Sequence, residues 1–282
     1  MRRFRYVLVD VFTDTPLEGN QLAVFTDARD LTDGDMQALA RELNIAETVF
    51  VLPPSSRDAD VRIRIFTPAT ELPFAGHPTL GTAFVLGGPL SAIILRLETK
   101  SGVVPVELER EGPKIVFGRM EQPLFTWEPV VDPAPLLAAL GVARSELPVE
   151  RYALGPGHSF VALASPADLT ALVPDLDALS RLTTAGTYCF ARDGDGVKAR
   201  VFLPGIGIPE DPATGSGAGP LAVHLARHGW KAWGDEVRIS QGAEIGRPST
   251  LYGQAFAEQG ELRQVVVGGP AVVVARGEFS LP

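Results

Sequence analysis

The sequence predicts an α+β protein of two pseudo-symmetric lobes, each a mixed or antiparallel sheet wrapped round a central helix. Three observations support this fold class: the second half of the chain repeats the first, strand-like segments outnumber helical ones, and a Gly-rich turn precedes a helical segment in each half. Because few strands are separated by crossover helices, a doubly wound parallel sheet is disfavoured. The 282 residues are enough for one large domain or two ordinary ones, and the repeat favours two.

The repeat consists of three weak matches in the same order and at nearly one offset. From Arg64 to Arg200 this offset is 136 positions. Such agreement indicates duplication of one folding unit. The matched pairs of segments are 64–81 with 200–217, 19–31 with 157–169, and 35–50 with 175–190.

The residues able to do chemistry do not repeat with the rest of the pattern. Each lobe is therefore expected to bring its own polar groups to one asymmetric site in a shared cleft. The mismatched pairs are Glu47 with Thr187, His77 with Ala213, and Asp211 with Ala75.

Period-two alternation of apolar residues predicts many strands. An amphipathic helix is predicted over 33–43 with Asp33 as its cap, and helices over 78–86 and 220–228 follow the two Gly-rich turns. Each lobe should then hold many strands and about two helices. The predicted strands are 6–12, 21–25, 48–52, 61–66, 93–98, 103–110 and 114–119.

A cluster of prolines from Pro123 to Pro135 interrupts both periodicities and is the best linker candidate. We therefore expect one lobe over residues 1–120 and a second over residues 121–282. The first would carry the glutamate and histidine candidates, and the second an aspartate and the second Gly-rich turn. The last predicted strand, about 271–282, has the option of returning to pair with the first lobe.

Composition narrows the range of partners and locations. The net charge of −9 argues against nucleic acid or an anionic membrane as the main partner, because both repel such a surface. The basic start is interrupted by Asp10, so it does not read as a signal peptide. The longest apolar stretch, 265–275, falls short of the roughly 20 residues that a membrane helix needs. A soluble, cytoplasmic protein is expected.

Metal and disulfide chemistry are disfavoured. Cys189 is the only cysteine, so it allows neither an intrachain disulfide nor a cysteine-based metal cage, and it is expected in the core. His224 and His228 are four residues apart on a predicted helix, a spacing that suits metal binding. Without a His-Glu-x-x-His pattern, a satisfied or solvated helix face is the more common explanation. No metal site is expected.

Glu47 lies among apolar residues where a helix gives way to a strand. Burial favours the uncharged form of a carboxyl group, which suits a residue that both takes and gives a proton near neutral pH. The alternative is an exposed glutamate at the end of a strand.

The two Gly-rich turns are candidate anion sites. His77 lies just before a predicted helix, where backbone N–H groups bind carboxylates and the imidazole can donate a hydrogen bond or a proton; a buried residue capping the turn is the alternative. The turn over 209–219 contains Asp211 but has neither the P-loop ending nor the dinucleotide spacing, so phosphate binding is not expected. Asn20 and His158 occupy equivalent turns, and each either lines the cleft or holds its turn.

Taken together, these motifs resemble the PhzF family of isomerases, named for phenazine biosynthesis, within the diaminopimelate epimerase-like fold. The resemblance covers nearly the whole chain. It implies two pseudo-symmetric lobes, each a sheet round a central helix, with the ligand between the two helix starts. The motifs that carry it are Val9–Phe12, Gly19–Val24, Ala46–Phe50, Phe66–Pro68, Glu71–Thr79, Glu210–Ser216 and Gly246–Ser249.

The resemblance also implies an activity. It points to a homodimeric, cofactor-independent isomerase that moves a proton between carbons of a small cyclic amino or hydroxy carboxylic acid, similar to a dihydro-hydroxyanthranilate. Glu47 would be the general acid/base, while His77 and Asp211 would hold the hydroxyl and amino groups. Arg247 either lines the cleft or has a structural role. The residues that would bind the substrate, mainly its carboxylate, are Asn20, Gly76, Thr214, Gly215 and Ser216.

Two further hypotheses are weighed against this one. The related epimerases use two cysteines at positions that are Gly76 and Thr214 here, so two-thiol racemisation is excluded. A non-catalytic protein that binds small carboxylates on the same fold is the remaining alternative, because a fold alone does not fix a function.

Overall fold

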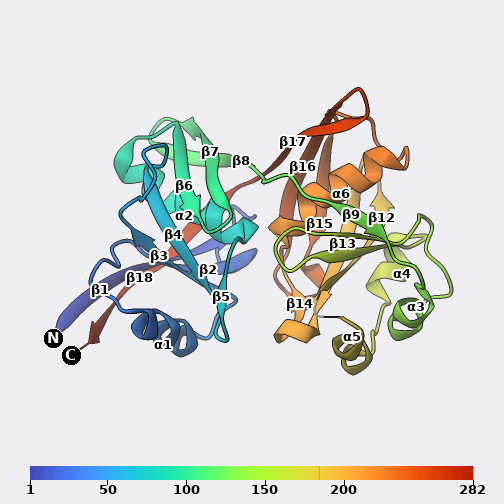
Figure 1. Ribbon diagram of the computed structural model, residues 1–282, viewed down its shortest axis with the longest axis horizontal. Helices are drawn as coiled ribbons and strands as arrows, with labels where there is room; N and C mark the ends of the chain where they lie inside the picture. Colours follow the sequence, from blue (N-terminus) through green and yellow to red (C-terminus); the bar gives the residue numbers. More distant parts are fainter. Residues whose placement is uncertain (184, 282) are drawn as a thin grey trace. The chain divides into compact units, whose positions relative to one another are not determined.

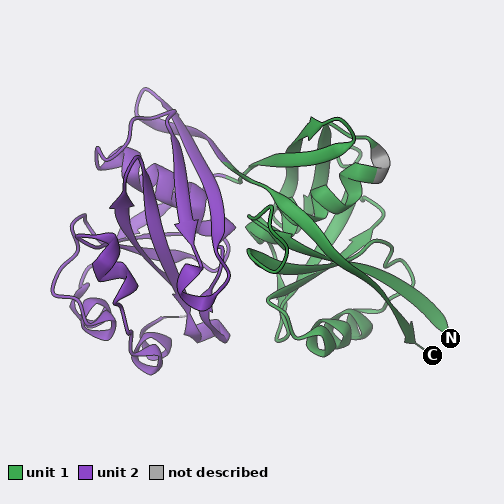
Figure 2. Cartoon of the chain, turned by 180° about the vertical axis from the view of Figure 1, so that it is seen from behind, with its two compact units in different colours: residues 1–123, 267–282 green, residues 124–266 purple. Residues whose placement is uncertain are grey.

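A computed structural model describes residues 1–183 and 185–281 (Figure 1). The chain divides into two compact units, unit 1 with residues 1–123 and 267–282 and unit 2 with residues 124–266 (Figure 2). The described residues form six α-helices and eighteen strands. The predicted α+β class is confirmed. None of the helices in these ranges is long and apolar enough to cross a lipid bilayer.

The strands of unit 1 pair in the order β18–β1–β2–β3–β4–β6–β7–β8, and the short β5 pairs with β4. The pairs β2–β3 and β4–β6 are parallel, and the other pairs are antiparallel. Figure 1 shows these strands curving round α2 (Gly76–Leu90), which packs against seven of them. The strands are β1 (Arg2–Val11), β2 (Asn20–Phe25), β3 (Glu47–Leu52), β4 (Val61–Phe66), β5 (Glu71–Leu72), β6 (Ile94–Thr99), β7 (Gly102–Glu111), β8 (Lys114–Glu121) and β18 (Ala271–Leu281).

The strands of unit 2 pair in the order β9–β10–β11–β12–β13–β15–β16, with β14 on β13. Here the pairs β11–β12 and β13–β15 are parallel. The helix α6 (Gly215–Arg227) is buried from Gly215 to Leu225 and packs against β15 and β16. The strands are β9 (Trp127–Pro129), β10 (Glu150–Tyr152), β11 (His158–Ala162), β12 (Gly186–Asp193), β13 (Gly196–Leu203), β14 (Ile208–Asp211), β15 (Glu236–Gln241) and β16 (Ser249–Glu258); β17 (Glu261–Gly269) crosses the unit boundary.

The two units are copies of one design. From β1 to β7 and from β10 to β16, the same order of antiparallel and parallel pairs recurs. A bidentate ion pair also recurs, because Arg64 holds Glu71 across β4 and β5 as Arg200 holds Glu210 across β13 and β14. These pairs brace the strand that leads into each central helix. The predicted architecture, a sheet round a helix in each half, is confirmed.

The outer helices differ from the prediction. The helix α1 (Asp33–Leu43) packs against β3 and β4, and its N-cap is Thr32 rather than the predicted Asp33. About two helices per lobe is wrong for unit 2, which adds three short helices to α6 among its described residues. They are too short for a helical period to be visible in the sequence. These helices are α3 (Ala134–Leu140), α4 (Pro166–Thr170) and α5 (Leu176–Leu182).

The short helices of unit 2 cover a second hydrophobic core. Leu136, Leu169 and Leu179, one from each helix, pack in a cluster with Phe202 of β13. Cys189 belongs to the same cluster and is fully buried, so its predicted place in the core is confirmed.

Candidate functional site

Glu47 and His77 form the polar centre of unit 1. Glu47 begins β3, and His77 is the second residue of α2. Glu47 Oε2 lies 3.0 Å from His77 Nε2, and the two side chains are 9% and 6% exposed. Glu47 is therefore a buried carboxylate held against an imidazole, and the alternative of an exposed strand-end glutamate is wrong.

Asn20 orients this pair from the other side of the imidazole. It begins β2, is buried, and places Nδ2 3.3 Å from His77 Nδ1. An amide nitrogen only donates, so Nδ1 accepts and the ring proton lies on Nε2. In this tautomer Nε2 carries the ring proton and lies 3.0 Å from Glu47 Oε2, within ion-pair distance but without hydrogen-bond geometry.

A close approach of helix and sheet places His77 near the strand ends. A Cβ added at Gly81 of α2 would lie 2.6 Å from Val11 Cγ2 and 2.7 Å from Leu22 Cδ2. Only glycine leaves room for α2 to lie this near to β1 and β2. Because Leu22 of β2 pairs with Glu47 of β3, the same contact fixes the helix relative to the carboxylate.

Asp211 and Thr214 form a second polar group, in unit 2. Asp211 ends β14 and Thr214 is the N-cap of α6. The Thr214 hydroxyl donates to Asp211 Oδ2 at 2.6 Å. Gln241, at the end of β15, donates from Nε2 to the Asp211 carbonyl at 2.7 Å and to Thr214 Oγ1 at 2.9 Å, and its Oε1 accepts from Thr214 N at 3.2 Å. Gln241 thus stabilises the turn between Asp211 and Thr214 with three hydrogen bonds.

Sequence reasoning missed Gln241. It lies 27 positions beyond Thr214 and belongs to no chemical motif, so only the pairing of β15 with β13 brings it to the turn.

Ser216 and His158 complete the group in unit 2. Ser216 is the second residue of α6, and His158 begins β11. Their Oγ and Nε2 atoms are 3.0 Å apart, and both residues are buried. Burial lowers the pKa of the His158 imidazole to about 3, so the ring is neutral at physiological pH.

Comparing the units corrects the pairing expected from the sequence. The central helices begin at Gly76 and Gly215, 139 positions apart, so the counterpart of His77 is Ser216 and not Ala213. Counted from the equivalent residues Phe66 and Phe202, the segment leading to α6 is longer by three residues than the one leading to α2, and it holds the 3₁₀ turn Pro204–Ile206.

The carboxylate has no counterpart in unit 2. Thr48 pairs with Phe66 across β3 and β4, and Thr187 pairs with Phe202 in the same way across β12 and β13. The counterpart of Glu47 is therefore Gly186, not Thr187. A Cβ at Gly186 would lie 2.4 Å from His158 Nδ1, so the imidazole fills the space that a side chain would need.

The predicted site residues thus gather into two groups, one within each unit. Neither α2 nor α6 has a side-chain cap or a first-turn acidic residue within residues 1–183 and 185–281. The first peptide groups of such a helix favour an anion. Unit 1 holds Asn20, Glu47, Gly76 and His77, and unit 2 holds Asp211, Thr214, Gly215 and Ser216.

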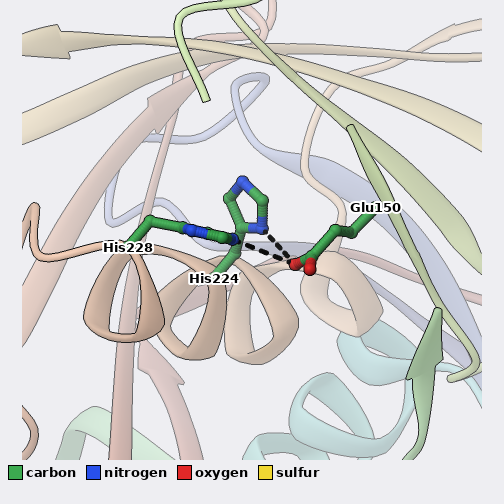
Figure 3. Close-up of side chains that lie close together, drawn as sticks. All are labelled: Glu150, His224 and His228. Atoms are coloured by element: carbon green, nitrogen blue, oxygen red, sulfur yellow. Dashed lines mark hydrogen bonds and ion pairs between the residues drawn. The ribbon is translucent and has the colours of Figure 1, made fainter. Parts of the chain in front are cut away.

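One further cluster has the donor atoms of a metal site. Glu150 of β10 lies beside His224 and His228 of α6 (Figure 3), with Oε2 3.2 Å from His224 Nδ1 and 3.1 Å from His228 Nε2. The carboxylate that the sequence motif lacked comes from a distant strand. The same oxygen also accepts from Arg227 at 2.5 Å and from Tyr152 at 2.9 Å.

The electrostatics of this cluster favour a structural role. Burial alone would raise the pKa of Glu150, but hydrogen bonds from Arg227, His228 and Tyr152 outweigh it and lower the pKa to about 2. Burial lowers the pKa of His224 to about 4. Since Arg227 already neutralises the carboxylate, a divalent cation would have to displace the guanidinium.

Comparisons with known proteins agree over the whole chain. The family model described as phenazine biosynthesis-like protein matches residues 9–277. The trans-2,3-dihydro-3-hydroxyanthranilate isomerase of Pseudomonas aeruginosa is 50% identical over 277 residues, which cover 98% of this chain and 99% of that protein. A solved PhzF-family structure from Bacillus anthracis aligns with a TM-score of 0.87 at 25% identity over 100% of both chains. A hydroxyproline epimerase of Agrobacterium vitis, with a TM-score of 0.70 at 12% identity over 99% of this chain and 91% of that one, shares the fold.

Proposed function

Because the chain belongs to the phenazine biosynthesis-like (PhzF) family, we propose that it isomerises a small cyclic amino or hydroxy carboxylic acid similar to trans-2,3-dihydro-3-hydroxyanthranilate. The chain is an isomerase: three relatives that each align with 98% of it carry that name. These relatives do not favour the alternative of a non-catalytic carboxylate-binding protein.

Glu47 is the proposed acid and base of this reaction. Its carboxylate would take a proton from one carbon of the substrate, and the electron pair would shift along the double bonds. The resulting carboxylic acid, whose proton can exchange with solvent, would then protonate another carbon. The substrate is rearranged without net loss of atoms or electrons, so this scheme needs no cofactor. The observation that carries it is the buried contact of 3.0 Å between Glu47 Oε2 and His77 Nε2, which holds the carboxyl group beside an imidazole.

The remaining roles in the proposal are those that the family resemblance implies, and the donors and acceptors at the two helix starts suit them. His77 and Asp211 would hold the hydroxyl and amino groups of the substrate. The positive ends of the α2 and α6 dipoles suit a carboxylate. The groups proposed to bind it are the backbone N–H groups of Gly76 and Gly215 and the hydroxyls of Thr214 and Ser216, with Asn20 also in contact.

Solvent exchange in heavy water tests the role of Glu47. Wild-type protein incubated with the dihydro-hydroxyanthranilate should convert it and incorporate deuterium at carbon, and Glu47→Gln should lower both rates by about a thousandfold. Glu71→Gln is the matched control, because Glu71 is a half-buried carboxylate of unit 1 whose side chain forms ion pairs with Arg64 and Lys100. Exchange retained in Glu47→Gln would refute the assignment.

We further propose that the protein acts in the cytoplasm as a homodimer, which the family resemblance supports. Light scattering should give about twice the chain mass of 30.0 kDa. A mass of one chain at micromolar concentration would contradict the dimer.

A further inference from the structure

We propose that His158 is a positioning residue that makes the Ser216 hydroxyl a one-way hydrogen-bond donor to the carboxylate of the substrate. The inference rests on the proposed function, because it concerns the same substrate. It assigns a role to a histidine that the proton transfer itself does not use.

The environment of His158 fixes its tautomer. Among residues 1–183 and 185–281, Nδ1 has no hydrogen-bond partner, and it faces the backbone of Gly186 so closely that a Cβ there would lie at 2.4 Å. A ring lone pair tolerates the weakly positive Cα hydrogens of a glycine, whereas an N–H pointed at them would be a buried donor without an acceptor. The proton of the neutral ring therefore lies on Nε2.

This tautomer decides how Ser216 uses its hydroxyl. Nε2–H donates to Ser216 Oγ across 3.0 Å, so the oxygen is the acceptor in that bond. Within the described part of the chain, His158 is the only hydrogen-bond partner of this hydroxyl. Its own hydrogen is thus available to an acceptor that a ligand brings. A carboxylate offers acceptors alone, so it fits such a donor.

The counterpart pair in unit 1 has the same direction. Asn20 at the start of β2 donates to His77 on α2, and His77 Nε2, which carries the remaining ring proton, lies 3.0 Å from Glu47 Oε2. In unit 2, His158 at the start of β11 donates to Ser216 on α6. In both units the strand residue sets which way the helix residue donates. Unit 2 differs because a ligand, and not a side chain of the unit, would supply the acceptor for the Ser216 hydroxyl.

The tautomer can be read directly by NMR on the resting protein. The chain has four histidines, so ¹⁵N-histidine labelling with His158→Gln as the assignment variant identifies the resonances of His158. We expect a neutral ring protonated at Nε2, unchanged from pH 8 to pH 5. A proton on Nδ1, or an imidazolium at pH 7, would overturn the inference.

Kinetics test the link to the substrate carboxylate. Ser216→Ala and His158→Leu should each raise KM about tenfold with a smaller effect on kcat, because a hydrogen bond to a charged group is lost or misdirected. The double variant should match Ser216→Ala alone. His158→Gln, which keeps an amide donor, should recover most of the loss. If His158→Leu raised KM equally in the Ser216→Ala background, the coupling would be refuted.

A control separates this role from packing. His224→Leu removes an equally buried histidine from α6, and it should lower stability without changing KM. The two proposals also fail differently. Should Glu47→Gln retain exchange, the proposed chemistry falls while the tautomer of His158 still stands; should the proton lie on Nδ1 in an active enzyme, only the role of His158 falls.

Discussion

Glu47 Oε2 lies 3.0 Å from His77 Nε2, with both side chains more than nine-tenths buried. The contact joins the start of a strand to the second residue of the central helix. Its polarity is set by Asn20, whose amide leaves His77 only Nε2–H to offer. Three side chains from three elements therefore form one buried group, in which a hydrogen bond joins Asn20 to His77 and a 3.0 Å contact joins His77 to Glu47.

Reversing the direction of the hydrogen bond between Asn20 and His77 should impair the enzyme. Asn20→Asp replaces the donor to His77 Nδ1 with an acceptor of the same size, so a proton moves to Nδ1 and the imidazolium becomes favoured. We expect kcat to fall about a hundredfold. ¹⁵N NMR should show His77 protonated on both nitrogens at pH 7. Asn44→Asp, the same change at the end of α1, should leave kcat unchanged; an active Asn20→Asp enzyme would contradict the assigned direction.

Two glycines of α2 should respond oppositely to alanine. At Gly81 a Cβ would lie 2.6 Å from Val11 and 2.7 Å from Leu22, so Gly81→Ala should push the helix off the sheet and cost about 1–3 kcal/mol of unfolding free energy. At Gly88 no described atom lies within 4 Å of the added carbon, so Gly88→Ala should stabilise by about 0.5–1 kcal/mol. Urea unfolding measures both. Equal effects of the two changes would refute the close approach.

Stability should fall with acid because of the buried histidines. Burial lowers the pKa of His158 to about 3 and that of His224 to about 4, whereas an unfolded histidine titrates near 6.5. Below pH 6.5 the unfolded chain binds protons that the folded chain does not, so the unfolding free energy drops by about 1.4 kcal/mol per pH unit for each group. This loss continues down to pH 4 for His224 and pH 3 for His158.

Urea midpoints between pH 7 and pH 5 test this dependence. His158→Gln removes one of the two histidines. It should therefore reduce the fall of the unfolding free energy with pH by the contribution of one proton, about 1.4 kcal/mol per pH unit. A variant with the wild-type slope would show that His158 does not resist protonation.

Arg227 should be what keeps metal out of the cluster of Glu150, His224 and His228. Arg227→Met leaves the buried carboxylate without its cation, so stability should fall by about 3–5 kcal/mol and Zn²⁺ should restore part of it. Calorimetry should show that the variant binds Zn²⁺ at least tenfold more tightly than wild type. Adding His228→Gln should abolish the gain; undiminished Zn²⁺ affinity would mean that other ligands are involved.

The sequence was enough to predict the elements with strong hydrophobic periodicity and to single out the motifs that carry polar residues. The helix 33–43 and the strand 61–66 have the bounds that the pattern indicates. The expected counterpart of His77 was wrong because a constant offset does not account for the three residues added before α6. The expected counterpart of Glu47 was wrong by one residue, which only the strand pairing shows. Gln241 and Glu150 escaped notice since each acts through strands distant in sequence from its partners, and tertiary contacts of that kind leave no local pattern.

The pairing of β18 with β1 has a consequence for biosynthesis. Unit 2 is one unbroken stretch, whereas unit 1 needs residues 267–282, which the ribosome makes after the whole of unit 2. Unit 2 can therefore reach its native state during translation, while the half that carries the carboxylate must wait for its final strand. We therefore expect the nascent enzyme to be inactive until that strand pairs with β1.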